Sequence, residues 1–379
     1  MTRVYLDYAA STPLDRTVAR EMHRTEKYFS NTSSLYRSGR EANEVLQTSL
    51  KKIGMFFGAK SEEIIITSGT TESNNLAILG TARLRSGGEI ISVKSEHSSV
   101  REPIKQLRSE GYKIRWCKLD KHGRVELSEL KKLLNKKTIL ISIAYANGEI
   151  GTIQPMGKIA KMVRDFEINN ETKVVLHTDI SAAIGTLNCD VNRLGADLVT
   201  CGASKIYGPK GVGIIYIKRN TPIKNMFYGG FQQSAMRPGT EDLVSIVGFA
   251  ESLQILNTRR STDARKYQQY YIDCIHNITG IEYLENGHPK DRIYSVLSLC
   301  FDNISGENIV AYLDAEGFEI ATGAACEASN DKPSEALIAI GRTLSQAQGS
   351  VRISFGRRTS QSDINRFIKI FNKVLKELY

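Results

Sequence analysis

The sequence lacks the long apolar runs and closely spaced cysteines that mark several classes of protein. No stretch of its 379 residues approaches the roughly 20 consecutive apolar residues that a membrane helix needs. Residues 1–7 contain one arginine and then an aspartate, without the apolar core of a secretory signal. The six cysteines are too sparse for a disulfide framework, and no two form the CxxC pair typical of zinc sites. These absences predict a cytoplasmic protein without a membrane span or a metal site.

The positive charge is concentrated in two segments. The chain has 51 Lys+Arg against 41 Asp+Glu, a net charge of +10. Residues 101–137 contribute +7 and residues 351–379 contribute +5, so the remainder is slightly acidic. Such segments suit nucleic acid or an acidic partner, but they are also typical of solvated helix faces. Both interpretations stay open at this point.

The order of apolar patterns predicts the fold class. Hydrophobic residues make up 41% and charged residues 24% of the chain, which excludes general disorder, and no repeat of 20–50 residues indicates a solenoid. Short β-branched runs alternate with longer amphipathic ones, so we expect an α/β fold with a mainly parallel seven-stranded sheet covered by helices on both faces. The expected strands are 63–67, 89–94, 113–118, 138–144, 173–179, 198–201 and 213–217. The expected helices are 73–85, 100–110, 127–134 and 156–166.

The pattern changes after residue 256. A long polar helix over 262–278, short strands over 295–301 and 351–354, and a closing helix over 362–378 indicate a smaller α+β domain. The polar stretch 257–262 is the expected boundary. We therefore predict a large domain over residues 14–256 and a small domain formed by residues 1–13 and 257–379.

Three segments place polar residues at strand ends, where open α/β sheets bind ligands. Residues 67–73 (TSGTTES) can offer the free N–H groups of a helix N-terminus to an anion, although an ordinary helix cap explains them equally well. Asp179 can pair with a protonated nitrogen, bind a ribose or a metal, or cap the next helix. Lys205 is suited to forming a Schiff base, although a surface lysine in a turn is the simpler interpretation.

Together the three segments predict a site for pyridoxal 5'-phosphate (PLP). The phosphate needs a helix N-terminus, the pyridinium nitrogen needs a carboxylate that keeps it protonated, and the aldehyde needs a lysine. His97 follows a fourth expected strand and is placed to stack on the cofactor ring. A purely structural histidine is the alternative.

With these residues, the sequence resembles a known family, the cysteine desulfurases, which are fold-type-I PLP enzymes. The similarity covers nearly the whole chain, up to residues 351–357 (VRISFGR). The most specific stretches are 4–13 (VYLDYAASTP), 67–75 (TSGTTESNN), 147–151 (NGEIG), 205–211 (KIYGPKG), 236–240 (MRPGT) and 323–326 (GAAC).

The resemblance implies that L-cysteine is converted to L-alanine, with the sulfur held as a persulfide and passed to a sulfur-acceptor protein. It also implies a homodimer. Residues 326–336 resemble the long loop of the housekeeping group, which carries the reactive thiol. The implied roles are Lys205 as the Schiff-base lysine and base for the α-proton, Asp179 as the pyridinium partner, His97 as the ring-stacking residue, Thr70 and Thr71 in the phosphate loop, Thr240 as a phosphate contact from the other subunit, Arg352 as the binder of the substrate carboxylate, Asn147 as a residue beside the substrate, and Cys326 as the nucleophile.

Several positions at the cofactor depart from the family pattern. Where the family usually has Gln, this chain has Ala182, and the usual second Asn of the NNEIG stretch is Gly148. The usual Ser-Gly-His before the lysine is residues 202–204 (GAS), in which Ser204 is expected to restore one cofactor contact. Residues 229–233 read GGFQQ instead of GGGQE. Because the lysine, aspartate, histidine, arginine and cysteine all remain, we expect a divergent but active enzyme.

Two other functions stay open. One is a different fold-type-I PLP activity, an aminotransferase or a lyase. The presence of Cys326 in a long loop disfavours this alternative. The other is a weakly active or non-catalytic scaffold that depends on a partner. The destination of the sulfur also stays open among iron–sulfur cluster assembly, tRNA thiolation and DNA phosphorothioation, and direct contact with nucleic acid is an option for the basic segments.

Overall fold

The computed structural model describes residues 3–323 and 333–379. Its largest sheet has seven strands in the order β2-β8-β7-β6-β5-β3-β4, which confirms the predicted strands. Only β8 runs antiparallel to its neighbours, because residues 203–212 connect it to β7 without the long crossover that parallel strands require. The strands are β2 (Ile64–Thr67), β3 (Glu89–Ser92), β4 (Lys113–Trp116), β5 (Thr138–Ser142), β6 (Val175–Asp179), β7 (Leu198–Gly202) and β8 (Gly213–Ile217).

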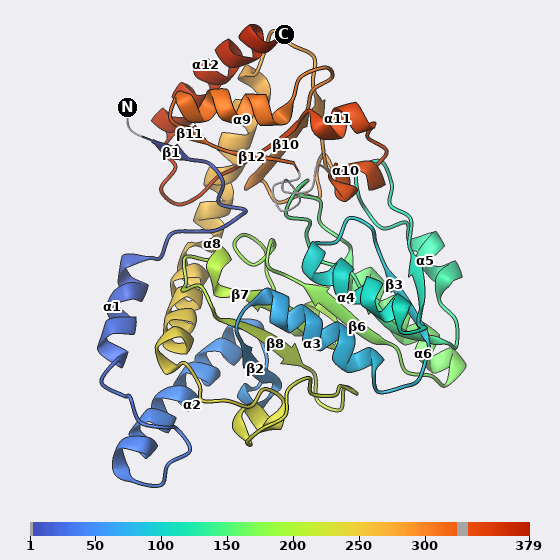
Figure 1. The fold of residues 1–379 in the computed structure, drawn as a ribbon, viewed down its shortest axis with the longest axis vertical. Coiled ribbons are helices and arrows are strands. Elements are labelled where there is room, and N and C mark those ends of the chain that lie inside the picture. Colours follow the sequence, from blue (N-terminus) through green and yellow to red (C-terminus); the bar gives the residue numbers. More distant parts are fainter. Residues whose placement is uncertain (1–2, 324–332) are drawn as a thin grey trace.

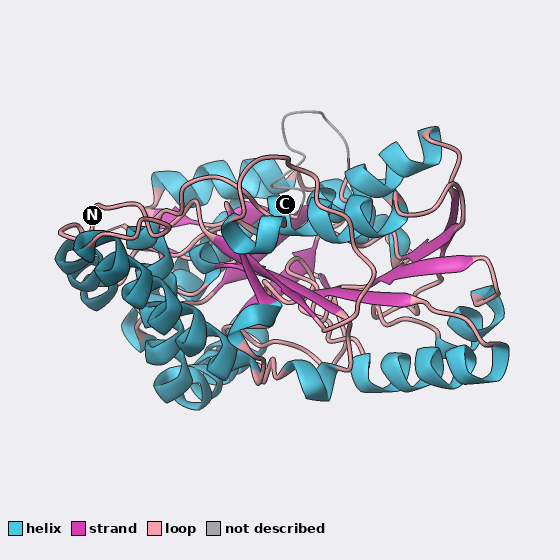
Figure 2. Cartoon of the chain, turned by 90° about the horizontal axis from the view of Figure 1, so that it is seen from below, coloured by secondary structure: helices cyan, strands magenta, loops and turns pink. Residues whose placement is uncertain are grey.

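Helices cover both faces of this sheet (Figures 1 and 2). They are α3 (Thr70–Ala82), α4 (Ser98–Ser109), α5 (Leu127–Leu133), α6 (Met156–Asn170) and α7 (Val191–Leu194). Three 3₁₀ turns, η1 (Ser61–Glu63), η2 (Ala203–Lys205) and η3 (Gln232–Ala235), precede β2, follow β7 and follow β8. The four helices predicted here are confirmed with shifted ends. α3 is buried around most of its circumference, which explains why its apolar residues show no single face. None of the described helices is long and apolar enough to cross a membrane.

A 35-residue helix, α8 (Leu243–Asn277), runs from the large sheet to the smaller one (Figure 1). The prediction that this helix begins at residue 262 was wrong. It begins at Leu243, where the Asp242 carboxylate accepts a hydrogen bond from the Ser245 N–H at 3.0 Å, and residues 257–262 continue it. Its first half packs against α1 (Arg16–Thr25) and α2 (Arg37–Phe57), so tertiary contacts rather than local propensity extend it.

The second hydrophobic core surrounds a four-stranded antiparallel sheet, ordered β12-β13-β10-β9. Its elements are β9 (Leu284–Glu285), β10 (Val296–Cys300), β12 (Ala321–Thr322), β13 (Ser350–Ser354), α9 (Gly306–Ala315), α10 (Glu335–Ala339), α11 (Leu344–Gln348) and α12 (Gln361–Leu378). β1 (Val4–Tyr5) pairs with β11 (Phe318–Glu319), so the N-terminus joins this part of the chain. The division at residue 256 stays a prediction, which these two cores support.

Candidate active site

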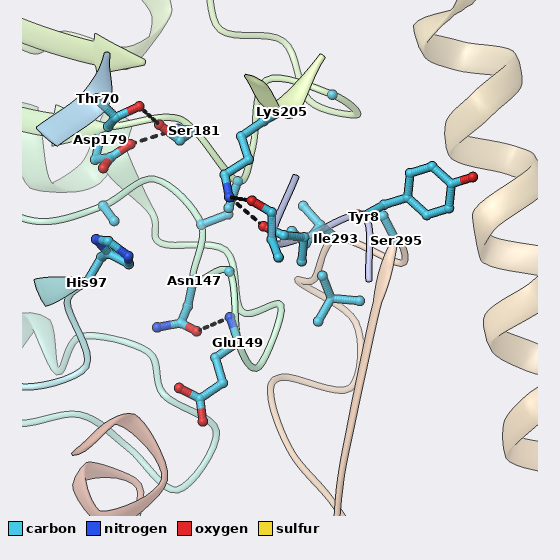
Figure 3. Close-up of a pocket in the computed structure, with 18 of the residues that line it drawn as sticks. Tyr8, Thr70, His97, Asn147, Glu149, Asp179, Ser181, Lys205, Ile293 and Ser295 are labelled. Carbon is cyan, nitrogen blue, oxygen red and sulfur yellow. Dashed lines mark hydrogen bonds between the residues drawn. The ribbon is translucent and has the colours of Figure 1, made fainter. Parts of the chain in front are cut away.

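A cavity of about 510 Å³ lies between the carboxyl ends of the parallel strands and the smaller sheet. One wall consists of residues that directly follow β2, β3, β5, β6 and β7, and the opposite wall includes Arg352 and Phe355 from β13 and the residues after it. Figure 3 shows Lys205, Asp179, His97 and Asn147 around this space. The structure therefore brings together most of the residues predicted from strand ends.

Asp179 is the last residue of β6 and is 8% exposed. Its two carboxylate oxygens each accept a hydrogen bond, Oδ2 from Asn74 Nδ2 at 2.9 Å and Oδ1 from the Ser181 N–H at 2.8 Å. Both oxygens are thus held by N–H donors, which fixes the orientation of the carboxylate at the cavity. Asn74 was missed as a site residue by the sequence analysis, although it lies within the stretch 67–75 that marked the family.

A buried histidine behind Asp179 orients Asn74. Burial lowers the pKa of His177 to about 4, so the ring is neutral. Its Nε2 lies 3.0 Å from Thr200 Oγ1, and that hydroxyl donates to Asn74 Oδ1 at 2.5 Å. Since Thr200 uses its proton for Asn74, His177 carries its proton on Nε2 and accepts through Nδ1 from Ser142 Oγ at 2.8 Å. The chain of bonds turns the Asn74 amide group toward Asp179.

Lys205 ends the 3₁₀ turn η2 that follows β7, and its ammonium group enters the cavity (Figure 3). Lys205 Nζ donates to the carbonyl oxygens of Ala9 and Ala10, both at 2.6 Å. The N-terminal segment therefore lies directly against the lysine. No local pattern predicts this contact, since about 195 residues separate the partners along the chain.

The N-terminus of α3 points its first turn at the cavity. Gly69 precedes it with φ of 145°, a conformation that L-residues rarely adopt. Thr70 and Thr71 line the cavity, and Thr70 Oγ1 lies 3.0 Å from Ser181 Oγ. Free N–H groups and hydroxyls at a helix N-terminus suit a phosphate, and Ser204 lines the same cavity.

Gly202, one of the departures from the family pattern, has a packing reason. A Cβ atom at this position would lie 2.8 Å from Thr70 Oγ1 and 3.4 Å from Thr70 N. Glycine therefore lets the start of α3 approach the end of β7 closely. A serine at this position would require the Thr70 side chain to move.

His97 is both a helix cap and a cavity residue. It is the N-cap of α4, where Nδ1 accepts from the Ser99 N–H at 3.1 Å and lies 2.8 Å from Ser99 Oγ. Ser99 Oγ also accepts from Asn74 Nδ2 at 2.9 Å. The structural and functional interpretations of His97 are thus compatible, because the cap fixes the orientation of the ring.

Asn147 lines the cavity, but its amide group is bonded within the chain. Its Nδ2 donates to the Ser95 carbonyl at 2.8 Å, and its Oδ1 accepts from the N–H groups of Glu149 and Ile150. These bonds hold the turn that places it beside the cavity.

Gly148 and Ala182, two further positions that differ from the family pattern, lie close to each other. A Cβ atom on Gly148 would lie 3.5 Å from Ala182 Cβ, which is ordinary van der Waals contact. Both residues line the cavity.

Arg352 lies on β13, is 7% exposed and lines the cavity on the side of the smaller sheet. Its Nη2 donates to Asp7 Oδ1 at 2.9 Å. A guanidinium group can bind a carboxylate with two parallel hydrogen bonds, which lysine cannot do. Asp7 was not predicted as a site residue.

Glu96 is a second carboxylate that the sequence analysis missed. It lines the cavity, is 5% exposed, and accepts from the Ala144 N–H at 2.7 Å through Oε1. Burial raises its pKa to about 8. Its position directly before His97 is the one signal in the sequence that points to it.

Thr240 lies apart from this cavity. It borders a separate depression with Ile66, Gly211 and Arg237. Thr240 therefore does not line the cavity in which its own chain would hold the cofactor phosphate. The predicted contact of Thr240 with the phosphate in a second subunit stays a prediction.

Cys326 lies outside the described residues. Gly323 and Ser334, described residues on either side of it in the sequence, both line the cavity. The five other cysteines are buried and free, and burial raises the pKa of each. Since the thiolate is the reactive form, none of these five is suited to act as a nucleophile.

The residues present fit PLP. Asp179 offers a buried acceptor, Lys205 an amine, and α3 an anion site, all in one cavity. The cavity volume is in the range of small-molecule sites, roughly 300–1,000 Å³. When bound, PLP would supply an electron sink for carbanion chemistry at an amino acid.

Comparison with known proteins agrees with this arrangement. The family model described as aminotransferase class-V matches residues 4–367. The chain is 38% identical over 381 residues to the cysteine desulfurase IscS of Dictyoglomus turgidum, covering 99% of this chain and 95% of the relative. A NifS-like protein of solved structure has a TM-score of 0.92 and 30% identity, with both chains covered completely. SspA, solved in complex with cysteine, has a TM-score of 0.82 and 27% identity over 93% of this chain and 99% of its own.

The chain belongs to the class-V aminotransferase family and has the fold-type-I architecture of these PLP-dependent enzymes. Within that family it belongs to the cysteine desulfurases. The family resemblance, the fold class and the PLP cofactor predicted from the sequence are confirmed.

Proposed function

We propose that this cysteine desulfurase takes the sulfur of L-cysteine onto Cys326. The Cys326 thiolate attacks the substrate sulfur, the Cβ–S bond breaks, and L-alanine leaves while a persulfide stays on Cys326. The observation that carries this proposal is the single cavity that holds Lys205, Asp179 and Arg352 and is lined by Gly323 and Ser334.

Each site residue has a role in this proposal. Lys205 would hold the cofactor aldehyde, and its Nζ would take the α-proton of the substrate. Asp179 would pair with the protonated ring nitrogen of the cofactor, and His97 would stack on the ring. Arg352 binds the substrate carboxylate. The phosphate contacts come from Thr70, Thr71 and Ser204, and Asn147 lies beside the substrate.

A homodimer is part of the proposal. Large hydrophobic side chains are exposed in two segments, 29–36 and 227–231, with Leu35 88% and Phe231 93% exposed. A hydrogen bond of 2.8 Å from Thr32 Oγ1 to Glu241 Oε2 holds the first segment beside residues 236–241. Exposed apolar surface of this kind marks an interaction site. A second copy on this surface brings Thr240 to the phosphate of its partner, and light scattering of the purified enzyme tests the dimer.

The sulfur passes from Cys326 to an acceptor. An acceptor protein for iron–sulfur assembly, tRNA thiolation or DNA phosphorothioation is the proposed class of partner, and an acidic acceptor would be contacted by exposed basic residues of 101–137. Direct contact with nucleic acid is a second proposal, and it is tested by measuring whether nucleic-acid binding depends on salt concentration.

The cysteines of the described residues are free, which fits a reducing compartment, and we propose the cytoplasm.

Measuring alanine and sulfide release by Cys326→Ala tests the proposed chemistry. We expect both to fall to background while the absorbance of bound PLP is retained, because Cys326 does not hold the cofactor. Cys117→Ala is the matched control, since Cys117 is buried with its pKa raised to about 12. Full alanine release by Cys326→Ala would instead favour a lyase, whereas formation of the keto acid of cysteine without alanine would favour an aminotransferase. A wild-type protein that binds PLP but releases no alanine would favour a scaffold.

A further inference from the structure

The N-terminal segment of residues 7–12 connects the two ends of the cavity. Its sequence is among the stretches most specific for the family, yet none of its residues has a role in the proposed function. In the structure it lies between β13, which carries Arg352, and the turn that carries Lys205. The segment is bonded to β13 at one end and to the turn that carries Lys205 at the other.

The first end is bound to the smaller sheet. Asp7 forms a β-bridge with Ser354. Ser354 N donates to the Leu6 carbonyl at 2.7 Å, and Ser354 Oγ accepts from the Ala9 N–H at 2.9 Å. Tyr5 Oη lies 2.7 Å from the Asp7 carbonyl oxygen and braces the chain from the other side. The backbone of Asp7 therefore has a fixed position relative to β13.

The second end is bound to the lysine turn. Thr12 donates twice to the Ser204 carbonyl, from N and from Oγ1, both at 2.9 Å. Thr12 Oγ1 also accepts from the Tyr207 N–H at 2.7 Å. Between the two ends, the carbonyl oxygens of Ala9 and Ala10 accept from Lys205 Nζ (Figure 3). The segment thus holds the lysine and reaches β13 within six residues.

Asp7 uses this fixed position to hold Arg352. The Asp7 Oδ1 to Arg352 Nη2 distance is 2.9 Å, and the two side chains are 19% and 9% exposed. Among the described residues, Asp7 is the only carboxylate within 4 Å of this guanidinium group. An ion pair that is this well shielded from water is screened little by salt. Only one of the five guanidinium N–H donors is used by Asp7.

This arrangement matters for binding a carboxylate. A free arginine side chain loses considerable rotamer freedom when it is ordered by a ligand, and that loss weakens affinity. A guanidinium group that is already oriented offers its remaining N–H groups to two carboxylate oxygens in a set direction. Asp7 also lowers the local positive charge, which weakens the attraction of a carboxylate to Arg352. The orientation of Arg352 and this loss of charge therefore have opposite effects on substrate affinity, and measuring that affinity shows which effect is larger.

We propose that Asp7 is a positioning residue that orients Arg352 to bind the carboxylate of the substrate amino acid. This inference rests on the proposed role of Arg352. It assigns the N-terminal motif a task in the reaction, because the segment that carries Asp7 also holds Lys205, and it therefore sets the carboxylate end of the substrate relative to the lysine.

The test compares Asp7→Ala and Asp7→Asn with the wild-type holoenzyme. We expect Asp7→Ala to raise the KM for L-cysteine about tenfold and to leave kcat within about twofold, because the substrate carboxylate is bound equally in the ground state and in the transition state. The Kd of L-alanine, followed by the absorbance of bound PLP, should rise in parallel. Asp7→Asn keeps an oxygen that accepts from Nη2, so we expect it to stay within about threefold of wild type in both constants.

Asp314→Asn is the matched control. It removes another ion pair of the N-terminal region, between Arg3 and Asp314 at 2.7 Å, but that carboxylate is 52% exposed and lies outside the cavity. We expect wild-type constants. An unchanged Kd and KM in Asp7→Ala, or a lower kcat with unchanged KM, would overturn the positioning role. A lower KM in Asp7→Asn would overturn it too, since charge would then outweigh orientation.

Arg352→Lys separates this inference from the function on which it rests. If Arg352→Lys leaves the Kd of L-alanine unchanged, Arg352 does not bind the carboxylate and the proposed role of Arg352 fails. If Arg352→Lys weakens binding while Asp7→Ala does not, only the positioning role fails. In the double variant we expect the effect of Arg352→Lys alone, because Asp7 acts through Arg352.

Discussion

Glu96 provides the sharpest test of the electrostatics of the cavity. Its side chain is buried, with one oxygen bonded to the Ala144 N–H and no hydrogen-bond partner for Oε2 among the described residues. Burial raises the pKa from 4.5 to about 8, and the nearby Asp179 carboxylate adds to the rise, whereas the Ala144 N–H and Arg101 oppose it. The folded protein therefore holds a proton on Glu96 at pH values where the unfolded chain has lost it.

The sign of the pH dependence follows from this difference. Between pH 4.5 and about 8 the folded state binds one more proton at Glu96 than the unfolded state, so the free energy of unfolding falls as the pH rises through that window. Above about pH 8 the contribution levels off. With about 1.4 kcal/mol for each pKa unit, the total change is on the order of 5 kcal/mol. In the variant Glu96→Gln the residue is neutral at every pH and keeps an oxygen for the Ala144 N–H.

Thermal unfolding of wild type and Glu96→Gln, followed by circular dichroism from pH 5 to pH 9, measures this effect. We expect similar Tm values near pH 5 and a higher Tm for Glu96→Gln at pH 8.5, by roughly 5 °C, since each kcal/mol shifts the Tm of a chain of this length by about 1 °C. Glu102→Gln, which removes an exposed carboxylate of α4, is the control and should follow the wild-type curve. Parallel curves for wild type and Glu96→Gln would show that Glu96 is ionised in the folded protein, and the reasoning would be refuted.

Three further predictions concern the cofactor end of the cavity. Lys205→Ala should lose the visible absorbance of lysine-bound PLP together with all alanine release, and retention of either would contradict its role. Asn74→Ala leaves Asp179 with one hydrogen bond fewer, and we expect roughly 10–100-fold weaker PLP binding in a fluorescence titration. Gly202→Ala places a Cβ against the start of α3 and should lower the free energy of unfolding by about 1–3 kcal/mol, whereas Gly157→Ala, with ordinary contact distances, should not.

The strand-end residues could be predicted from the sequence because they depend on local pattern. An apolar run followed by a polar group predicts both a strand and the edge at which that group lies, so the sequence alone places Lys205, Asp179, His97 and Thr70 in one site. The same rule found the seven strands of the large sheet. Each of these inferences needs only a few neighbouring residues and the common direction of parallel strands.

The supporting contacts could not be predicted in this way. Asn74 meets Asp179 across 105 positions of the chain, and Asp7 meets Arg352 across 345. Such pairs depend on how whole elements pack. The helix boundary failed for a related reason, since the polar stretch 257–262 resembles a linker locally, yet the packing of α8 against α1 and α2 keeps it helical.

The structure shows the packing around Gly202, Gly148 and Ala182, three positions that differ from the family pattern. Gly202 leaves room for the Thr70 hydroxyl, whereas the space between Gly148 and Ala182 would accept a Cβ atom. A larger side chain at Gly202 would meet the Thr70 hydroxyl and would require the Thr70 side chain to move. A Cβ atom at Gly148 would meet Ala182 at an ordinary distance, so this position carries no packing conflict. Because Gly202 leaves the Thr70 hydroxyl where it lines the cavity, the change at position 202 is compatible with a working cofactor site.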